Sequence, residues 1–99
     1  MSNFVSAVRF VAKAGQRDLL IQRLSDFTLP TGALNHLIVQ TGGDSFMTVV
    51  MWREEQDLVN ARPSMIAFLD TVRDLLEQIS PDLGVTDPVS GPVLLNIQA

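Results

Sequence analysis

The chain of 99 residues contains no cysteine, and its one histidine is His36. The absence of cysteine excludes disulfide bonds, thiolate-bound metals, iron–sulfur clusters and a cysteine nucleophile. With a single histidine, a metal site would depend on carboxylates alone. Glycine-rich phosphate-binding loops and a Ser-His-acid order in a catalytic context are also missing. We therefore expect a protein without metal or other cofactors.

Positive charge is scarce and scattered. Seven basic residues face eleven acidic ones, giving a net charge of −4, and they form no basic run. Nucleic-acid binding needs a basic patch, so we do not expect it. The longest apolar runs fall short of the roughly 20 residues that cross a bilayer, which argues against a membrane protein. The start of the chain lacks the charged and apolar regions of a signal peptide. These absences predict a soluble, cytoplasmic protein.

Hydrophobic residues are plentiful by contrast, at 46% of the chain against 18% charged residues. Disordered chains combine low hydrophobicity with high net charge, so this composition indicates a folded protein. The length corresponds to one domain, residues 1–99. The chain is more apolar than so small a domain needs for its own core.

Hydrophobic patterning predicts an α+β protein with the element order β-α-β-β-α-β. The strands are expected at 4–12, 33–40, 45–52 and 93–97, the main helices at 16–27 and 63–79, a short helical connection at 53–61, and a loop at 82–92. Pro63 suits the first turn of a helix, and the glycines at 42 and 43 suit a hairpin. This order is typical of the ferredoxin-like fold, a four-stranded antiparallel sheet with both helices on one face.

The other face of that sheet is predicted to be apolar as well. In the third strand, Phe46, Val50 and Trp52 alternate with Met47, Val49 and Met51. Side chains alternate between the two faces of a strand, so neither face is polar. A large exposed apolar patch usually marks an interface. We therefore predict a homodimer that forms through the open sheet face.

Several short motifs, in this order, resemble the antibiotic biosynthesis monooxygenase family of small dimeric α/β-barrel proteins. The motifs are Lys13-Ala14-Gly15-Gln16, Thr31-Gly32-Ala33, Trp52 followed by Glu54-Glu55, and Pro63-Ser64-Met65. The resemblance implies a ferredoxin-like protomer, a barrel-forming dimer and a pocket between sheet and helices. It also implies cofactor-independent oxidation of a small aromatic or quinol-type compound.

The chain departs from characterised branches of that family at three positions. Arg62 stands near the place where the family commonly has a histidine. Ala7 stands near the first-strand asparagine of the haem-degrading branch, and Thr48 replaces an asparagine of the aromatic-polyketide branch. Haem degradation is therefore not expected of this chain.

Cofactor-free oxygenation needs an apolar pocket, a base and groups that stabilise an oxyanion. His36 is the candidate base, because its ordinary pKa lies near neutrality. Thr48 and Trp52 share a strand face and complete the predicted catalytic set, with Trp52 stacking on a flat substrate. Structural roles are the alternatives: His36 at a dimer interface or bonded to a neighbour, Trp52 in the core, and Thr48 as an ordinary strand residue.

Three further residues, Arg9, Asn35 and Arg62, are predicted to bind substrate. Arg9 lies inside an otherwise apolar strand, where it would hold a substrate anion or pair with a carboxylate across the dimer. The alternative for the whole protein is a non-catalytic dimer of the same fold that binds a small apolar or aromatic molecule or is purely structural. A cavity beside His36 or Trp52 would favour the enzyme, and a packed interior would argue against it.

Overall fold

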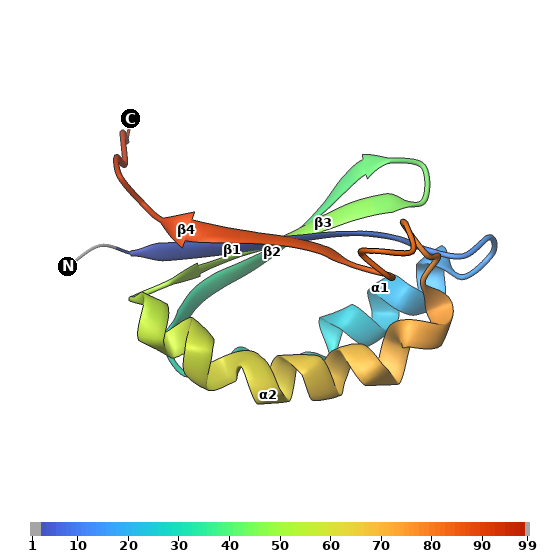
Figure 1. Cartoon of the computed structure of the whole chain (residues 1–99), viewed down its shortest axis with the longest axis horizontal. Helices are drawn as coiled ribbons and strands as arrows, with labels where there is room; N and C mark the ends of the chain where they lie inside the picture. Colours follow the sequence, from blue (N-terminus) through green and yellow to red (C-terminus); the bar gives the residue numbers. More distant parts are fainter. Residues whose placement is uncertain (1–2, 99) are drawn as a thin grey trace.

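The sheet carries a layer of helices on one face only (Figure 1). The computed structural model describes residues 3–98. The elements are β1 (Phe4–Val11), α1 (Arg17–Ser25), β2 (Ala33–Gly42), β3 (Ser45–Trp52), α2 (Glu55–Val72), the 3₁₀ turn η1 (Arg73–Leu75) and β4 (Asp87–Pro92). All strand pairs are antiparallel, in the order β2-β3-β1-β4. This confirms the predicted ferredoxin-like α+β fold.

The face of the sheet beneath the helices holds the core in two clusters. The first gathers around Phe10 at the end of β1, where its ring stacks on Phe46 of β3. The second gathers around Phe4 at the start of β1 and includes Trp52. Side chains of a strand alternate between its two faces. The middle of the helix-side face is therefore occupied by Ser6 and other residues that lie between the two clusters. The interior is therefore filled at both ends of β1 and less densely in between.

Helix α2 is longer at its start than the sequence predicts. A separate helical connection at 53–61 and a helix beginning at Pro63 were expected, but one helix runs through Pro63. A proline inside a helix removes a hydrogen bond and crowds the preceding turn, at a cost of about 3 kcal/mol. Leu58, Ala61, Met65 and Val72 recur at helical spacing and pack inward on both sides of the proline. Their continuous burial favours an unbroken helix, so the predicted boundary at Pro63 was wrong.

The same helix ends earlier than the predicted residue 79. After Val72 the chain tightens into η1, and Leu76 forms a bridge with Ala12. The Lys13 backbone N–H donates to Leu75 O at 2.8 Å, and the Glu77 N–H donates to Val11 O at 2.8 Å. Hydrogen bonds to the end of β1 thus replace the last helical turn.

The last strand lies at Asp87–Pro92, inside the segment predicted as a loop, and not at 93–97. The prolines of this segment suggested a loop, but β4 is an edge strand and pairs only with β1. The Val93 N–H donates to Asn3 O at 2.8 Å, so by alternation Pro88 and Pro92 occupy positions whose nitrogens face the free edge. Leu94, Leu95 and Ile97, which were predicted to lie in the last strand, follow β4 and are exposed.

The open face of the sheet is mostly apolar, as the alternation in β3 predicts. The register pairs Val5 with Met51 and Ala7 with Val49, on the side away from the helices. Leu37 of β2 faces the same side and is 54% exposed. Between residues 3 and 98, no helix is long and apolar enough to cross a membrane.

Candidate functional site

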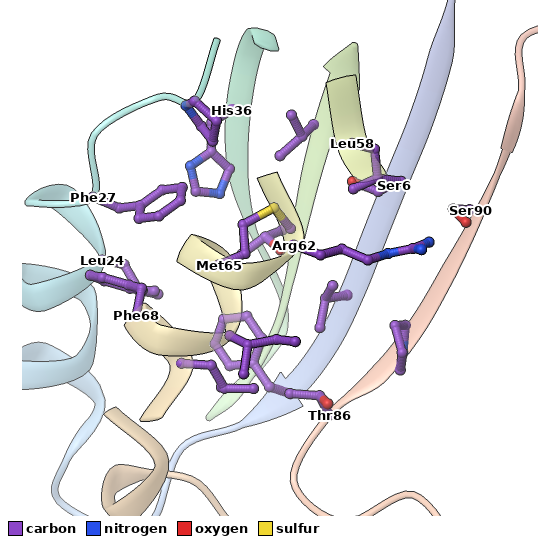
Figure 2. A pocket seen from close by; sticks show the side chains of 18 of the residues that line it. Ser6, Leu24, Phe27, His36, Leu58, Arg62, Met65, Phe68, Thr86 and Ser90 are labelled. Atoms are coloured by element: carbon purple, nitrogen blue, oxygen red, sulfur yellow. The ribbon is translucent and has the colours of Figure 1, made fainter. Parts of the chain in front are cut away.

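A cavity of about 500 Å³ lies between the sheet and the helices. It occupies the gap between the two core clusters and is lined by residues of all four strands and both helices (Figure 2). Pockets that bind small molecules have volumes of about 300–1,000 Å³ and mostly apolar walls. The space is therefore large enough for a compound of one or a few rings.

A few polar side chains break the apolar wall. They are Ser6, His36, Thr48, Arg62, Thr86 and Ser90. No aspartate or glutamate lines the cavity among the described residues. Hydrogen-bonding groups are thus present, but the wall carries no negative charge.

His36 lies at one side of the cavity, on β2 and opposite Val50 of β3. The side chain is half-buried, and the Phe27 ring meets it edge-on, with ring centroids 5.8 Å apart and planes at 80° (Figure 2). Burial lowers the pKa of His36 below its ordinary value of 6.5. The imidazole is therefore neutral at pH 7, which is the form that can accept a proton.

Trp52 contacts the cavity from within the core. It is fully buried, and its indole N–H donates to Ser6 Oγ at 3.0 Å. The indole N–H is thus already bonded, so what Trp52 presents to the cavity is ring surface. The Ser6 hydroxyl accepts this bond and keeps its own proton for another acceptor.

Ser6 was not among the predicted site residues, although the sequence contains a signal for it. It is the polar member of the series Phe4, Ser6, Val8 and Phe10, which alternation places on the helix side of β1. Ser90 was also missed, because its strand was predicted as a loop. The register pairs Ser90 with Ser6, so the two hydroxyl-bearing residues lie side by side on neighbouring strands.

The structure brings four of the six predicted site residues to this one cavity: His36, Thr48, Trp52 and Arg62. Thr48 lies on β3 between Val8 and Ile38 of the neighbouring strands. Arg62 extends from α2 toward the side of the cavity formed by β1 and β4 (Figure 2).

Arg9 and Asn35, the other two predicted site residues, lie away from the cavity. Arg9 pairs with Met47 in the register and thus faces the open side of the sheet, where its guanidinium binds Asp87 at 2.6 Å. Its carboxylate partner is therefore in the same chain. Asn35 lies at a register shift of β2, and its Oδ1 accepts the Met51 N–H at 3.3 Å. Both side chains are thus bonded to other parts of the sheet and do not line the cavity where they were predicted to bind substrate.

Metal-binding side chains do not gather in the described part of the chain. Residues 3–98 contain no group of three or more histidines, aspartates or glutamates placed to share a metal ion.

The strand order and the cavity place this protein among ferredoxin-like domains that have a cavity between the sheet and the helices. No protein-family model matches the sequence, and no curated protein matches it either. Solved structures do match over nearly the whole chain. One is described as a "putative antibiotic biosynthesis monooxygenase" from Deinococcus radiodurans, with TM-score 0.78, 14% identity and 97% of each chain covered.

Two other similar structures extend this comparison. SnoaB, a cofactor-independent oxygenase from Streptomyces nogalater, has TM-score 0.72 and 10% identity, with 100% of each chain covered. A dimeric ferredoxin-like protein from an uncultured marine organism has TM-score 0.75 and 9% identity, covering 100% of this chain and 94% of that one. At these identities the likeness establishes the fold. The names agree with the family resemblance of the sequence motifs.

Proposed function

We propose that this protein is a cofactor-independent monooxygenase that oxidises a small aromatic or quinol-type compound inside the cavity. The observation that carries the proposal is an apolar cavity of about 500 Å³ with a histidine in its wall, and burial lowers the pKa of that histidine. A similar structure is named a cofactor-independent oxygenase, which supports the same activity for this fold.

The reaction needs a base and an apolar space more than it needs a metal. His36 removes a proton from an acidic C–H or O–H of the substrate, and the resulting electron-rich anion reduces O₂. For an anthrone-type substrate, a ring CH₂ and O₂ become a ring C=O and H₂O, so one oxygen atom enters the product and the other leaves as water. The hydroxyls of Thr48 and Ser6 supply hydrogen bonds to the developing oxygen anion.

Oxygen uptake with a panel of anthrones and hydroquinones tests this proposal. We expect uptake by the wild type and a loss of about 100-fold in His36→Ala, the usual scale for removing a general base. Asn35→Ala is the matched control, because Asn35 lies on the same strand but away from the cavity. Trp52→Phe keeps an aromatic ring and removes the bond to Ser6, so we expect a smaller loss.

The pH dependence gives a second readout of His36. The base must be neutral to act, and burial lowers its pKa below 6.5. Activity should therefore persist at pH 6.5 and fall only at lower pH, as the imidazole becomes protonated. A rate that falls with a midpoint above pH 6.5 would contradict His36 as the base.

We further propose that the protein forms a homodimer through the open sheet face. Exposed apolar side chains such as Leu37 and Val39 lie on this face, next to Val49. A similar structure is named a dimeric ferredoxin-like protein, which supports the same assembly.

Binding without turnover would favour the alternative, a non-catalytic ligand-binding dimer. The same apolar cavity supports that function, because nothing in its shape requires chemistry. Ring compounds that bind the protein but cause no oxygen uptake above the His36→Ala level would decide for it.

A further inference from the structure

Arg62 is an exposed residue that differs from the other arginines in having no partner among residues 3–98. Arg9, Arg17, Arg53 and Arg73 form ion pairs with aspartates, and Arg23 donates to the Thr71 carbonyl at 3.0 Å. Within residues 3–98, Arg62 forms neither an ion pair nor a hydrogen bond, although its side chain lines the cavity. A guanidinium carries five donors and stays charged, so it is suited to a ligand that brings acceptors.

The charge of the cavity wall also favours a negatively charged ligand. Its wall contains no aspartate or glutamate among the described residues, and His36 is neutral at pH 7 because burial lowers its pKa. Among the described residues, Arg62 is thus the one charged side chain of the wall, in a protein of net charge −4. An anion would be repelled by most of the protein surface and attracted at this position.

Hydroxyl groups lie on the side of the cavity toward which Arg62 extends. Ser6 and Ser90 pair across β1 and β4 and face the helices, and Arg62 reaches toward these strands from α2 (Figure 2). Ser6 retains a free hydroxyl proton, because Trp52 donates to its oxygen. His36 and Phe27 lie on the other side, beyond Met65 (Figure 2). The cavity therefore has a cationic, hydroxyl-bearing side and an imidazole side, separated by apolar wall.

We propose that the ligand of this cavity is an aromatic compound with an anionic oxygen group, a carboxylate or a similar oxyanion, and that Arg62 binds this group with help from Ser6 and Ser90. The inference rests on the proposed function in taking the cavity as the ligand site, and it adds the substrate class. A guanidinium binds a carboxylate through two parallel hydrogen bonds, which fixes the orientation of the ring. Binding the anion at Arg62 turns the opposite end of the ring toward His36.

A pair of fluorescent probes tests the charge requirement directly. 8-Anilino-1-naphthalenesulfonate and N-phenyl-1-naphthylamine share the same ring system and differ by one sulfonate. We measure both dissociation constants for the wild type, Arg62→Gln and Arg62→Lys by fluorescence titration. Arg73→Gln is the control, because Arg73 is exposed like Arg62 and carries the same charge, but lies outside the cavity and pairs with Asp70.

We expect Arg62→Gln to weaken sulfonate binding about tenfold and to leave binding of the neutral probe unchanged, since it removes a charged hydrogen-bond donor. Arg62→Lys should restore part of the loss, and Arg73→Gln should change neither constant. An equal effect of Arg62→Gln on both probes, or none on either, would overturn the proposal.

The position of the bound probe is read from two unique signals, the imidazole of His36 and the indole N–H of Trp52, in a magnetic resonance titration. Both should shift when the sulfonate binds. A sulfonate that binds without shifting them lies outside the cavity and contradicts the proposal.

Anion binding at Arg62 without oxygen uptake supports this inference while the proposed function fails. Oxygen uptake that is unaffected by Arg62→Gln supports the proposed function and contradicts the role of Arg62 in binding the substrate.

Discussion

Gly32 shows how a single residue sets the geometry at one end of the cavity. It precedes β2 with a φ of +90°, and a Cβ at this position would overlap the Asp57 side chain on α2. The Gly32 carbonyl accepts the Arg53 N–H at 2.9 Å, and the Arg53 guanidinium binds Asp57 at 3.3 Å. Gly32 therefore lets the start of β2, the end of β3 and the start of α2 approach one another closely.

We predict that Gly32→Ala lowers the free energy of unfolding by about 2 kcal/mol or more, through a strained backbone and a collision. Urea unfolding measures this. Gly15→Ala is the control, because Gly15 has a φ of +78° with open space around it. Gly15→Ala should lower the free energy of unfolding only by the cost of holding alanine at a positive φ, about 1 kcal/mol. If the two variants lose equal stability, the contact with Asp57 has no energetic effect. Asp57→Ala should rescue part of the Gly32→Ala loss.

At the residue scale, the alternation of side chains was enough to place Thr48 and Trp52 on one face of a strand. The sequence left open whether His36 faces the cavity or a dimer interface, and the strand register places it on the cavity side. The sequence did not reveal that the Trp52 indole N–H is used by Ser6, since that bond joins residues 46 positions apart. The register shift between Ala33 and Asn35 is equally a property of the strand pair. Local patterns indicate which face a side chain takes, but not which partner it finds.

At the scale of elements, helix α2 and strand β4 show where local signals were overruled. By local rules Pro63 suits the first turn of a new helix, yet α2 runs through it because Leu58 and Ala61 before it, and Met65 after it, pack on the same side. The prolines of β4 indicate a loop by local rules, yet an edge strand tolerates them. In both elements, long-range contacts outweighed the local preference.

Pro63 should therefore carry a measurable cost. We predict that Pro63→Ala raises the free energy of unfolding by about 1–2 kcal/mol, because the missing helical hydrogen bond returns and the crowding is relieved. Part of the gain is offset by the greater freedom of the unfolded chain. Thermal unfolding measures it, with Pro81→Ala in an exposed turn as the control. A lower melting temperature for Pro63→Ala would mean that the proline fits the helix without strain.

At the scale of the whole molecule, the apolar composition is divided between two faces of one sheet. The helix side forms the two core clusters and the cavity wall, and the open side leaves apolar side chains exposed. A monomer gains nothing from that exposed surface, whereas a second copy that covers it removes apolar area from water.

We predict that sedimentation finds the wild type at twice the mass of the chain at micromolar concentration. Leu37→Asp should shift it to the monomer, because it places a charge in the apolar interface. Leu83→Asp is the matched control, because Leu83 is 45% exposed, similar to the 54% of Leu37, but lies in a loop outside the sheet. A monomeric wild type, or a dimer that survives Leu37→Asp, would contradict the proposed interface.

The sequence by itself determined the fold class and the apolar character of both sheet faces, because strand alternation and helical spacing are local properties. The tertiary structure decided that α2 crosses Pro63, that β4 is an edge strand, and that Arg62, Ser6 and Ser90 line one cavity. These outcomes depend on which segments become neighbours. The free energy of packing them together is larger than the local preference of any one residue.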